Sequence, residues 1–465
     1  MIENDAFKLL LINLFHLNPD DIANILCTTF NKMMVLLVTL TDKHQACPYC
    51  GFTAPKIKEY VTKEITHSAL TTQKCIIKYR ARRYKCSCCG KTYYEFNPFV
   101  FKSQKISILT VHNILKDLKD FNETFTSVAR RYHVSPTSVS TIFDNHVDIG
   151  RNPLPEIINF DEVYAFKSEK SKYVCVLLDF KKQIPVDVLP NRKKEYLLNY
   201  FQKIPLEERK KVKYACSDMY EVYRDVVHKV FPEAKHLLDY FHLSQDFHKK
   251  MNQVRIDVMK GYKDNKASDE YYLLKKFNWL LFKNPEDEDK YGRLFDVERE
   301  RKYNSHFKSY MNYYDLRKKL LEINNDLTIC YSLKLELVDF YSKSTIDNAK
   351  VNLENLIRSC IDTNIDEMIA FSNNLINWKQ EIINSFTIVG TEYKVEADKG
   401  QVVVCNKKVN NAIIENRNKI IKCIKNNANG YTNWSRFRNR VMYVLDPNAT
   451  FSLEPREKQS WMHKT

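Results

Sequence analysis

Two short apolar segments of the chain each end in an acidic residue, Asp161 in IINFD and Asp218 in VKYACSD. An ionised carboxylate is unstable inside a protein core unless it has a partner. Two carboxylates delivered by neighbouring strands also repel each other unless divalent cations lie between them. An aspartate at the end of one strand is commonly a helix cap, but two in this arrangement favour a two-metal site for phosphoryl transfer.

A third candidate ligand lies near the C-terminus, in a segment with the pattern of an amphipathic helix. In VNNAIIENRNKIIKCIK the apolar residues recur at helical spacing and predict a buried face. The polar stripe beside that face consists of Asn411, Glu415, Asn418 and Lys422. Glu415 is therefore a candidate for the third carboxylate, and Lys422, two turns further on, for contact with a phosphate near the reacting bond.

Four cysteines occur as two pairs, each followed by glycine, in CPYCG and CSCCG. A tight turn lets two thiolates face one ion, and glycine relieves backbone strain after the second cysteine. The segments between the pairs, KEYVTKEITH and QKCIIKYRARRYK, alternate like two paired strands. This pattern predicts a zinc ribbon with the ligands Cys47, Cys50, Cys86 and Cys89. Cys88, which lacks a following glycine, is an alternative ligand, and core cysteines without a metal are the competing interpretation.

Residues 105–152 predict a helix-turn-helix unit. Ser127 to Tyr132 form the first helix of the pair, and Ser135 caps a second helix that begins at Pro136, because Ser is favoured at the N-cap and Pro at the first helical position. The apolar packing positions are Val128, Ala129, Val134, Val139 and Ile142. The residues left facing a DNA groove are Thr137, Ser138 and Ser140. An ordinary small helical bundle is the alternative interpretation.

From residue 153 onward strands and helices alternate. Three strands (IINFD, YVCVLLDF and IPVDVLP) precede a helix, and VKYACSD and KHLLDY then alternate with further helices. This order is that of an α/β ribonuclease-H-like fold, in which the first and fourth strands are neighbours, so Asp161 and Asp218 are expected side by side. Residues 251–400 contain one proline and long helical patterns, and predict an all-helical insertion whose Trp and Phe residues form its core.

The composition favours a soluble protein with a polyanionic partner. With 73 Lys and Arg against 57 Asp and Glu, the formal net charge is +16. The N-terminal segment has no basic region followed by a cleavage site, and the longest apolar run, MMVLLVTL, is too short to span a membrane. Cysteines scattered through apolar runs are typical of reduced thiols. We therefore expect no membrane partner and a cytoplasmic location, with nucleoid association when the protein is bound to DNA.

Several motifs together resemble those of bacterial insertion-sequence transposases of the ISL-three family, over nearly the whole chain. They are CPYCG…RRYKCSCCGKTYYE, FDEVYAF, SDMYEVYRDVVHKVFPEAKHLLDYFH and ENRNKIIK…NGYTNWSRFRNRV. The resemblance implies a DDE transposase in which Asp161, Asp218 and Glu415 hold two Mg²⁺ or Mn²⁺ ions and the cysteines hold one structural Zn²⁺. The run LLDYFH matches a recurrent family motif, so Asp239 and His242 are candidates for a supporting role, with a strand end and helix cap as the alternative.

The expected activity is binding of the terminal inverted repeats of its own element, followed by metal-dependent strand cleavage and strand transfer. The partners are double-stranded DNA at the element ends and at the target, and further copies of the chain when two ends are paired. The alternatives are a non-catalytic, transposase-derived DNA-binding regulator that uses only residues 40–150, and a structure-specific nuclease of the same fold.

The predicted division of the chain follows these patterns. It comprises an N-terminal helix and strand segment (1–40), a zinc ribbon (41–104), a helix-turn-helix domain (105–152), the first part of the catalytic domain (153–250), the helical insertion (251–400) and the second part of the catalytic domain with a basic C-terminus (401–465). For the three arginines of that terminus, Arg436, Arg438 and Arg440, a solvated face and phosphate contact are both open.

Overall fold

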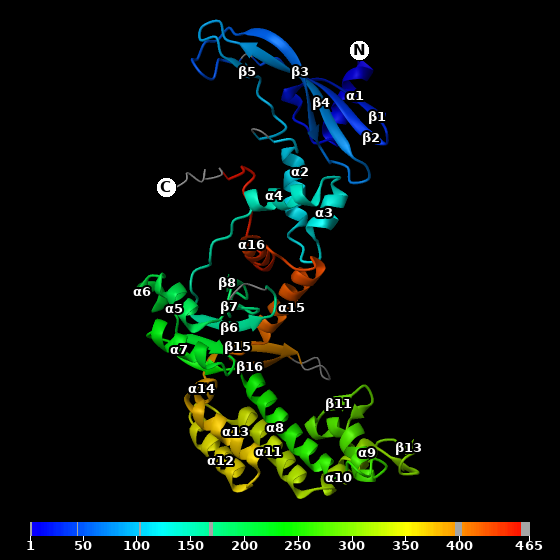
Figure 1. Cartoon of the computed structure of the whole chain (residues 1–465), viewed down its shortest axis with the longest axis vertical. Helices are drawn as coiled ribbons and strands as arrows, with labels where there is room; N and C mark the ends of the chain where they lie inside the picture. Colours follow the sequence, from blue (N-terminus) through cyan, green and yellow to red (C-terminus); the bar gives the residue numbers. More distant parts are fainter. Residues whose placement is uncertain (1, 44, 102–103, 167–170, 396–401, 457–465) are drawn as a thin grey trace.

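The computed structural model describes residues 2–43, 45–101, 104–166, 171–395 and 402–456. The molecule is elongated (Figure 1). An N-terminal sheet forms one end, a group of helices forms the other, and a second sheet lies between them, next to a small three-helix unit. No helix in the described part of the chain has the length and apolar composition needed to cross a membrane.

The N-terminal sheet has five strands in the order β1-β2-β4-β3, with β5 paired to β4. Its elements are α1 (Ile2–Leu14), β1 (Ile22–Phe30), β2 (Met33–Leu40), β3 (Lys56–Thr66), β4 (Cys75–Lys85) and β5 (Thr92–Tyr94). The predicted pairing of the strands between the two cysteine pairs is confirmed, because β3 and β4 are antiparallel. Strand β1 was not predicted, since most of its side chains are exposed and its residues do not alternate. Because β2 also pairs with β4, residues 1–40 and 41–104 share one sheet.

The three-helix unit consists of α2 (Ile108–Asp117), α3 (Phe125–Arg131) and α4 (Pro136–His146). Helix α3 begins two residues before the predicted start, because Thr124 caps it through a hydrogen bond to the backbone N–H of Ser127. The predicted cap of α4 is confirmed, since Ser135 accepts a 3.0 Å hydrogen bond from the N–H of Ser138. Of the five predicted packing residues, four are buried and Val134 is partly buried.

The central sheet has the strand order β10-β9-β6-β7-β8. Its strands are β6 (Ile157–Val163), β7 (Val174–Asp179), β8 (Pro185–Leu189), β9 (Tyr214–Ser217) and β10 (Lys235–Leu238). The first and fourth of them, β6 and β9, are parallel neighbours, as the ribonuclease-H-like order requires. The helices around it are α5 (Lys194–Gln202), α6 (Leu206–Arg209), α7 (Glu221–Val230), α8 (Tyr240–Lys260), α15 (Ala412–Asn427) and α16 (Trp434–Leu445).

Opposite faces of this sheet are covered by different helices. Helices α5 and α7 pack against Ile158 and Phe160 of β6 on one face. Helices α15 and α16 pack against Val163 of β6 on the other face, together with residues of β7 and β8. Because side chains alternate along a strand, Asn159 and Asp161 point to the same face as Val163, toward α15.

The insertion between α8 and α15 is mainly helical, but the prediction that it is all-helical is wrong. Its helices are α9 (Asp269–Lys276), α10 (Tyr313–Glu322), α11 (Asn325–Lys343), α12 (Ala349–Asp362), α13 (Asp366–Asn377) and α14 (Lys379–Asn384). Two short hairpins, β11–β12 (Glu288–Asp289, Gly292–Arg293) and β13–β14 (Lys302–Asn304, Ser309–Met311), interrupt them. A third hairpin, β15–β16 (Ile388–Val395, Val402–Lys408), precedes α15. The strands of the first two hairpins have only two or three residues and leave little periodicity in the sequence.

The core of the insertion contains aromatic residues, as predicted. Phe247, Phe371, Trp378 and Phe386 are all buried in one cluster with the leucines of these helices.

The arginines of α16 serve neither of the roles left open by the sequence. Arg440 is 1% exposed and donates to the backbone oxygens of Asp120 (2.8 Å) and Glu123 (2.7 Å). Arg436 pairs with Asp144 of α4, and Arg438 pairs with Asp187 of β8. These side chains connect the three-helix unit to the central sheet, so they are neither a solvated face nor a free phosphate-binding surface.

Candidate active site

Asp161 and Asp218 lie at the same level on adjacent strands. Strands β6 and β9 pair in parallel with Ile157 opposite Tyr214 and Asn159 opposite Cys216. Two residues further along, this register brings Asp161 level with Asp218, which directly follows β9. Both carboxylates are mostly buried, and burial and the Asp218 charge raise the pKa of Asp161 to about 7.

Two asparagines attach the start of helix α15 to strand β6. Asn159 donates from Nδ2 to Oδ1 of Asn411 (2.7 Å) and to the backbone oxygen of Asn410 (2.8 Å). Asn411, the N-cap residue of α15, in turn donates to the backbone oxygen of Phe160. Both asparagines are fully buried. Glu415, whose N–H donates to the Asn411 oxygen, is therefore held in the first turn of a helix fixed next to Asp161.

One turn further along α15, Asn418 contacts Asp161 directly. Its Nδ2 donates to Oδ2 of Asp161 over 2.7 Å, in a buried environment. The N–H of Glu162 donates to the other oxygen, Oδ1. Two donors therefore orient the Asp161 carboxylate, and the charge of Glu415 adds to the causes that raise the pKa of Asp161.

The Asp218 carboxylate is buried without complete hydrogen bonding. Burial raises its pKa to about 6, and the charge of Glu162 adds to this effect, while His242 and Arg192 oppose it. Its Oδ1 has no hydrogen-bond partner among the described residues. Since a buried acceptor without a partner is costly, this atom fits a ligand position for a cation.

The side chains of Asp239 and His242 lie next to that of Glu415. Asp239 follows β10 and precedes α8, and His242 is in the first turn of α8. Ligand atoms of Asp239, His242 and Glu415 all lie within 4.8 Å of one another. His242 Nε2 is 3.8 Å from Asp239 Oδ2, beyond hydrogen-bonding range, and neither atom has a hydrogen-bond partner within the described parts of the chain. Burial raises the pKa of Asp239, which backbone hydrogen bonds from Asn411 and Phe241 oppose.

The chemistry of this donor set fits divalent cations. Three buried atoms that can accept a proton or a metal, Asp218 Oδ1, Asp239 Oδ2 and His242 Nε2, have no donor facing them in the described structure. Carboxylate oxygens are the ligands that Mg²⁺ and Mn²⁺ prefer, and imidazole is acceptable to Mn²⁺ and related ions. The site can therefore hold cations between its carboxylates.

The sequence reasoning missed the anchoring role of Asn159 and the ion pair between Glu162 and Arg192. Asn159 carried a usable signal, because it is a polar residue two positions before Asp161 in an otherwise apolar strand. Arg192 lies in a loop 30 residues from Glu162, and nothing in the sequence points to their pairing.

The two cysteine pairs meet at one point. The Sγ atoms of Cys47 and Cys89 are 3.7 Å apart, and those of Cys50 and Cys86 are 3.5 Å apart. Tetrahedral zinc with Zn–S distances of about 2.3 Å places its sulfur ligands about 3.8 Å apart. Backbone N–H groups, chiefly that of Cys89, lower the pKa of the Cys86 thiol to about 7, which favours the thiolate. The cluster is thus compatible with a zinc ribbon.

Glycine is needed in both of these turns. Gly51 and Gly90 have φ angles of +75° and +71°, and each donates a hydrogen bond to the first cysteine of its pair. Side chains other than glycine are strained in this left-handed region. Cys88 is exposed and is not part of the four-cysteine group.

The residues predicted to contact DNA lie apart from the acids. On α4, Thr137 is exposed, while Ser138 and Ser140 are half-buried and bond within the helix or to its cap. Lys422 is exposed on α15, two turns from Glu415. The structure therefore leaves Thr137 and Lys422 accessible to a partner.

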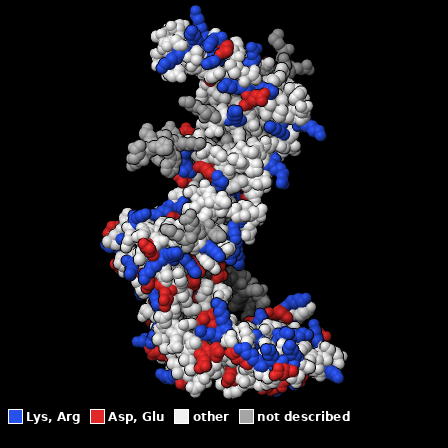
Figure 2. All heavy atoms as spheres, viewed as in Figure 1, with Lys and Arg blue, Asp and Glu red and all other residues white. Residues whose placement is uncertain are grey.

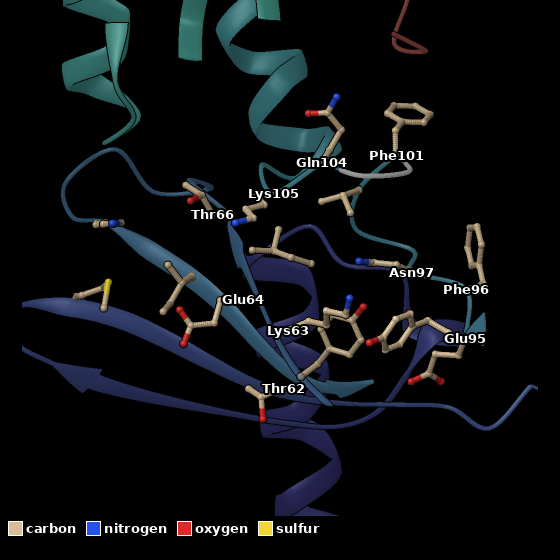
Figure 3. A pocket seen from close by; sticks show the side chains of 17 residues that line it. Thr62, Lys63, Glu64, Thr66, Glu95, Phe96, Asn97, Phe101, Gln104 and Lys105 are labelled. Carbon is tan, nitrogen blue, oxygen red and sulfur yellow. The ribbon is translucent and has the colours of Figure 1, made fainter. Parts of the chain in front are cut away.

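A groove on the N-terminal sheet contains none of the predicted site residues. It has a volume of about 1060 Å³ and lies between β3 and the segment that follows β5 (Figure 3). Acidic and basic side chains both line it, among them Glu64, Glu95, Lys63 and Lys105.

Comparison with known proteins identifies the family. A model of a transposase family, DDE_Tnp_ISL3, matches residues 158–397, which include Asp161, Asp218, Asp239 and His242, while Glu415 lies beyond the match. The chain is also 19% identical over 412 residues to the transposase for insertion sequence element IS1001 of Bordetella parapertussis, in an alignment covering 88% of this chain and 91% of that protein. The family match spans more than half of the chain, from the first strand of the ribonuclease-H-like sheet through the helical insertion, and the chain belongs to the ISL3 (ISL-three) family of transposases.

Proposed function

We propose that this transposase binds the terminal inverted repeats of its own insertion sequence and catalyses metal-dependent strand cleavage and strand transfer. The observation that carries this proposal is the convergence of Asp161, Asp218 and Glu415 from three separate elements, with a buried Asp218 oxygen that lacks a partner in the described structure. A protein that only bound DNA would have no use for buried, mutually repelling carboxylates.

In this proposal Asp161, Asp218 and Glu415 hold two Mg²⁺ or Mn²⁺ ions, and Asp239 and His242 support the site next to Glu415. Such ions, when bound, activate first water and then a 3′-hydroxyl for in-line attack and stabilise the leaving oxygen. The chain's own contribution is orientation. Asn418 and the N–H of Glu162 fix the Asp161 carboxylate, and Asn159 and Asn411 fix the helix that carries Glu415.

The four-cysteine cluster would hold one structural zinc ion. Cys47, Cys50, Cys86 and Cys89 are its ligands in this proposal, and the separation of their sulfur atoms supports it. The ion would fix the open end of the β3–β4 hairpin, because one cysteine pair precedes β3 and the other follows β4.

We assign DNA-end binding to the N-terminal sheet and the three-helix unit. Residues 41–104 contain twelve Lys and Arg against four Asp and Glu, and Figure 2 shows basic side chains on this end of the molecule with few acidic ones between them. Exposed aromatic residues alternate with the bases, for example Tyr60 beneath Arg80 and Tyr49 beneath Lys91. Basic and aromatic side chains together suit contact with the phosphate backbone.

Helix α4 would enter a groove with its N-terminal half, where Thr137, Ser138 and Ser140 lie. The ion pair between Arg436 and Asp144 supports a fixed orientation of this helix relative to the central sheet. A bound element end would thereby be held in a constant position relative to the acids. Lys422 would contact a phosphate of the DNA between α4 and the acids. Pairing two ends would require a second copy of the chain.

The experiment that tests the proposal is nicking of a labelled element end by the full chain in Mg²⁺, with DNA binding measured in parallel. The expected result is metal-dependent cleavage at the element boundary that is lost when any of the three acids is neutralised. Specific binding without any cleavage would instead favour the non-catalytic regulator. Cleavage of DNA junctions or ends irrespective of sequence would favour the structure-specific nuclease.

A further inference from the structure

A second group of metal-ligating side chains lies on the edge of the central sheet, separate from the acids described above. It consists of His228 on α7, His236 on β10 and Glu381 on α14, whose ligand atoms all lie within 4.8 Å of one another. His228 Nε2 and His236 Nδ1 are each 4.0 Å from the same atom, Oε1 of Glu381. Helix α14 packs against β10 here, at the point where the helical insertion meets the sheet (Figure 1).

The hydrogen bonds around His236 determine which of its nitrogens is free. The Ser217 hydroxyl donates to the backbone oxygen of Asp218 (2.9 Å), so its oxygen accepts from His236 Nε2, also at 2.9 Å. Because Nε2 carries the proton, Nδ1 presents a lone pair. His236 is 1% exposed, and its Nδ1 has no hydrogen-bond partner among the described residues. A second-sphere bond that fixes the tautomer of a histidine in this way is typical of metal ligands.

Glu381 is a buried acid whose charge is not balanced by a lysine or arginine of the described residues. It is 5% exposed, and among the described residues the basic groups that come within 4.0 Å of its carboxylate are the two imidazoles, with no lysine or arginine. The guanidinium group of the nearby Arg224 contacts other groups. Its Cζ lies 4.3 Å from the centre of the Trp378 ring, and its Nη1 donates to the backbone oxygen of Asn377. A carboxylate and an imidazole lone pair therefore face each other in a buried space, an arrangement that is repulsive unless a cation lies between them.

A proton shared between the two groups does not serve as this cation, because a distance of 4.0 Å exceeds that of a charge-assisted hydrogen bond. A metal ion bound by both atoms satisfies the Nδ1 lone pair and balances the carboxylate charge.

We propose that His228, His236 and Glu381 form a zinc site that fastens α14 of the insertion to the edge of the catalytic sheet. Two imidazoles and one carboxylate are a known donor set for Zn²⁺, with a fourth position filled by water. Tetrahedral zinc with ligand distances of about 2.0–2.2 Å needs ligand separations of about 3.3–3.5 Å, so the two 4.0 Å distances to Glu381 Oε1 contract by roughly half an ångström on binding. His228, whose side chain is 57% exposed, leaves the fourth position open to solvent.

The position of this site connects it to the proposed active centre. His236 bonds to Ser217, and Ser217 bonds to the backbone oxygen of Asp218. An ion held by His236 would thus stabilise the strand end that presents Asp218, as well as the docking of the insertion.

Zinc content of the purified full-length chain tests the proposal. We expect about two zinc ions per chain, one at the cysteines and one here. His228→Ala and Glu381→Gln should each remove about one ion, Cys86→Ser should remove the other, and a combined variant should retain none. Lys229→Ala, which changes an exposed neighbour of His228 on the same helix, is the matched control and should keep both ions.

Cobalt substitution and thermal unfolding give independent readouts. Co²⁺ at four thiolates produces a strong sulfur-to-metal charge-transfer band, whereas Co²⁺ at two histidines and a carboxylate produces only weaker visible bands. We expect the visible bands that remain in Cys86→Ser to disappear when Glu381→Gln is added. Added Zn²⁺ should raise the Tm of wild type more than that of Glu381→Gln.

Circular dichroism shows whether each variant is folded, and His228→Ala, at an exposed position, serves if Glu381→Gln does not fold. The proposal is overturned if His228→Ala and Glu381→Gln retain the zinc content of wild type. It is equally overturned if wild type holds a single zinc ion that Cys86→Ser removes entirely.

Discussion

Asn418 donates a 2.7 Å hydrogen bond to the Asp161 carboxylate, 257 residues earlier in the chain. The donor lies one turn after Glu415, so a single helix both presents one acid and holds another in place. The same helix is fixed at its start by the bonds between Asn159 and Asn411. Three buried asparagines thereby determine how α15 sits against β6.

We predict that Asn418→Ala slows DNA cleavage by about 10- to 100-fold while the protein remains folded and binds DNA. A hydrogen bond to a charged group contributes about 1.5–3 kcal/mol, and its loss frees the Asp161 carboxylate to rotate. Single-turnover nicking rates measured over a range of Mg²⁺ concentrations check this prediction. Asn416→Ala, an exposed position on the same helix, should cut at the wild-type rate. Equal rates for Asn418→Ala and wild type would show that this bond does not position the acid.

Neutralising each acid should abolish cleavage without unfolding the protein. Asp161→Asn, Asp218→Asn and Glu415→Gln preserve shape but remove a charge, and we expect nicking to fall by at least about a thousandfold, since in-line displacement requires both ions in place. DNA binding should be retained. Asp179→Asn is the control, because Asp179 caps the β7–β8 turn through the N–H groups of Lys181 and Lys182. If Glu415→Gln cut normally while Asp161→Asn did not, the third ligand would be sought at Asp239 or His242.

The metal-free protein should lose stability as the pH rises toward neutral. Burial and neighbouring charges raise the pKa of Asp161 from 3.8 to about 7 and that of Asp218 to about 6. Between about pH 4 and pH 7 the folded chain therefore binds more protons than the unfolded chain, so the free energy of unfolding decreases with pH.

Urea unfolding in the presence of a chelator measures this effect. In Asp161→Asn the decrease between about pH 5 and pH 8 should be smaller than in wild type by the order of 1 kcal/mol or more. Adding Mg²⁺ or Mn²⁺ should restore the stability of wild type at the higher pH. Parallel curves for wild type and variant would argue that Asp161 is charged without cost in the folded chain.

The four-cysteine cluster should bind zinc with a clear distinction between neighbouring cysteines. Cys86→Ser should release the ion of this cluster and loosen the β3–β4 hairpin, because Cys86 is buried and central to the group. Cys88→Ser, at an exposed position outside the group, should leave it bound. Thiol accessibility and metal content of the two variants are the measurements. Zinc release by Cys88→Ser, with retention in Cys86→Ser, would reverse the assignment.

A negative charge on the outer face of α4 should weaken binding to element ends. We expect Thr137→Glu to reduce affinity about tenfold or more, because its carboxylate would lie near DNA phosphates. Wild-type affinity should itself fall steeply as salt rises. Thr328→Glu, at an exposed position of α11, is the matched control and should bind as wild type does. An equal loss for both variants would indicate a general effect of charge and leave α4 without a specific role.

The sequence by itself determined the features that depend on nearby residues. The cap of α4 by Ser135, the glycine turns after each cysteine pair and the pairing of β3 with β4 all follow from side chains within one turn or one hairpin. The neighbouring positions of β6 and β9 in the central sheet were also predicted, from the order of strands and helices along the chain. Few sheet topologies are compatible with a given order of elements.

Only the tertiary structure decided the partners of buried polar groups. Arg440 is buried because it donates hydrogen bonds to the backbone oxygens of residues 120 and 123. Asn418 contacts Asp161 because α15 packs against β6 at that point. The meeting of Asp239, His242 and Glu415 has the same origin. Helix and strand patterns report which face of an element is buried, but the group across from a polar side chain belongs to a segment hundreds of residues away. Its identity is fixed only when the packing of both segments is fixed.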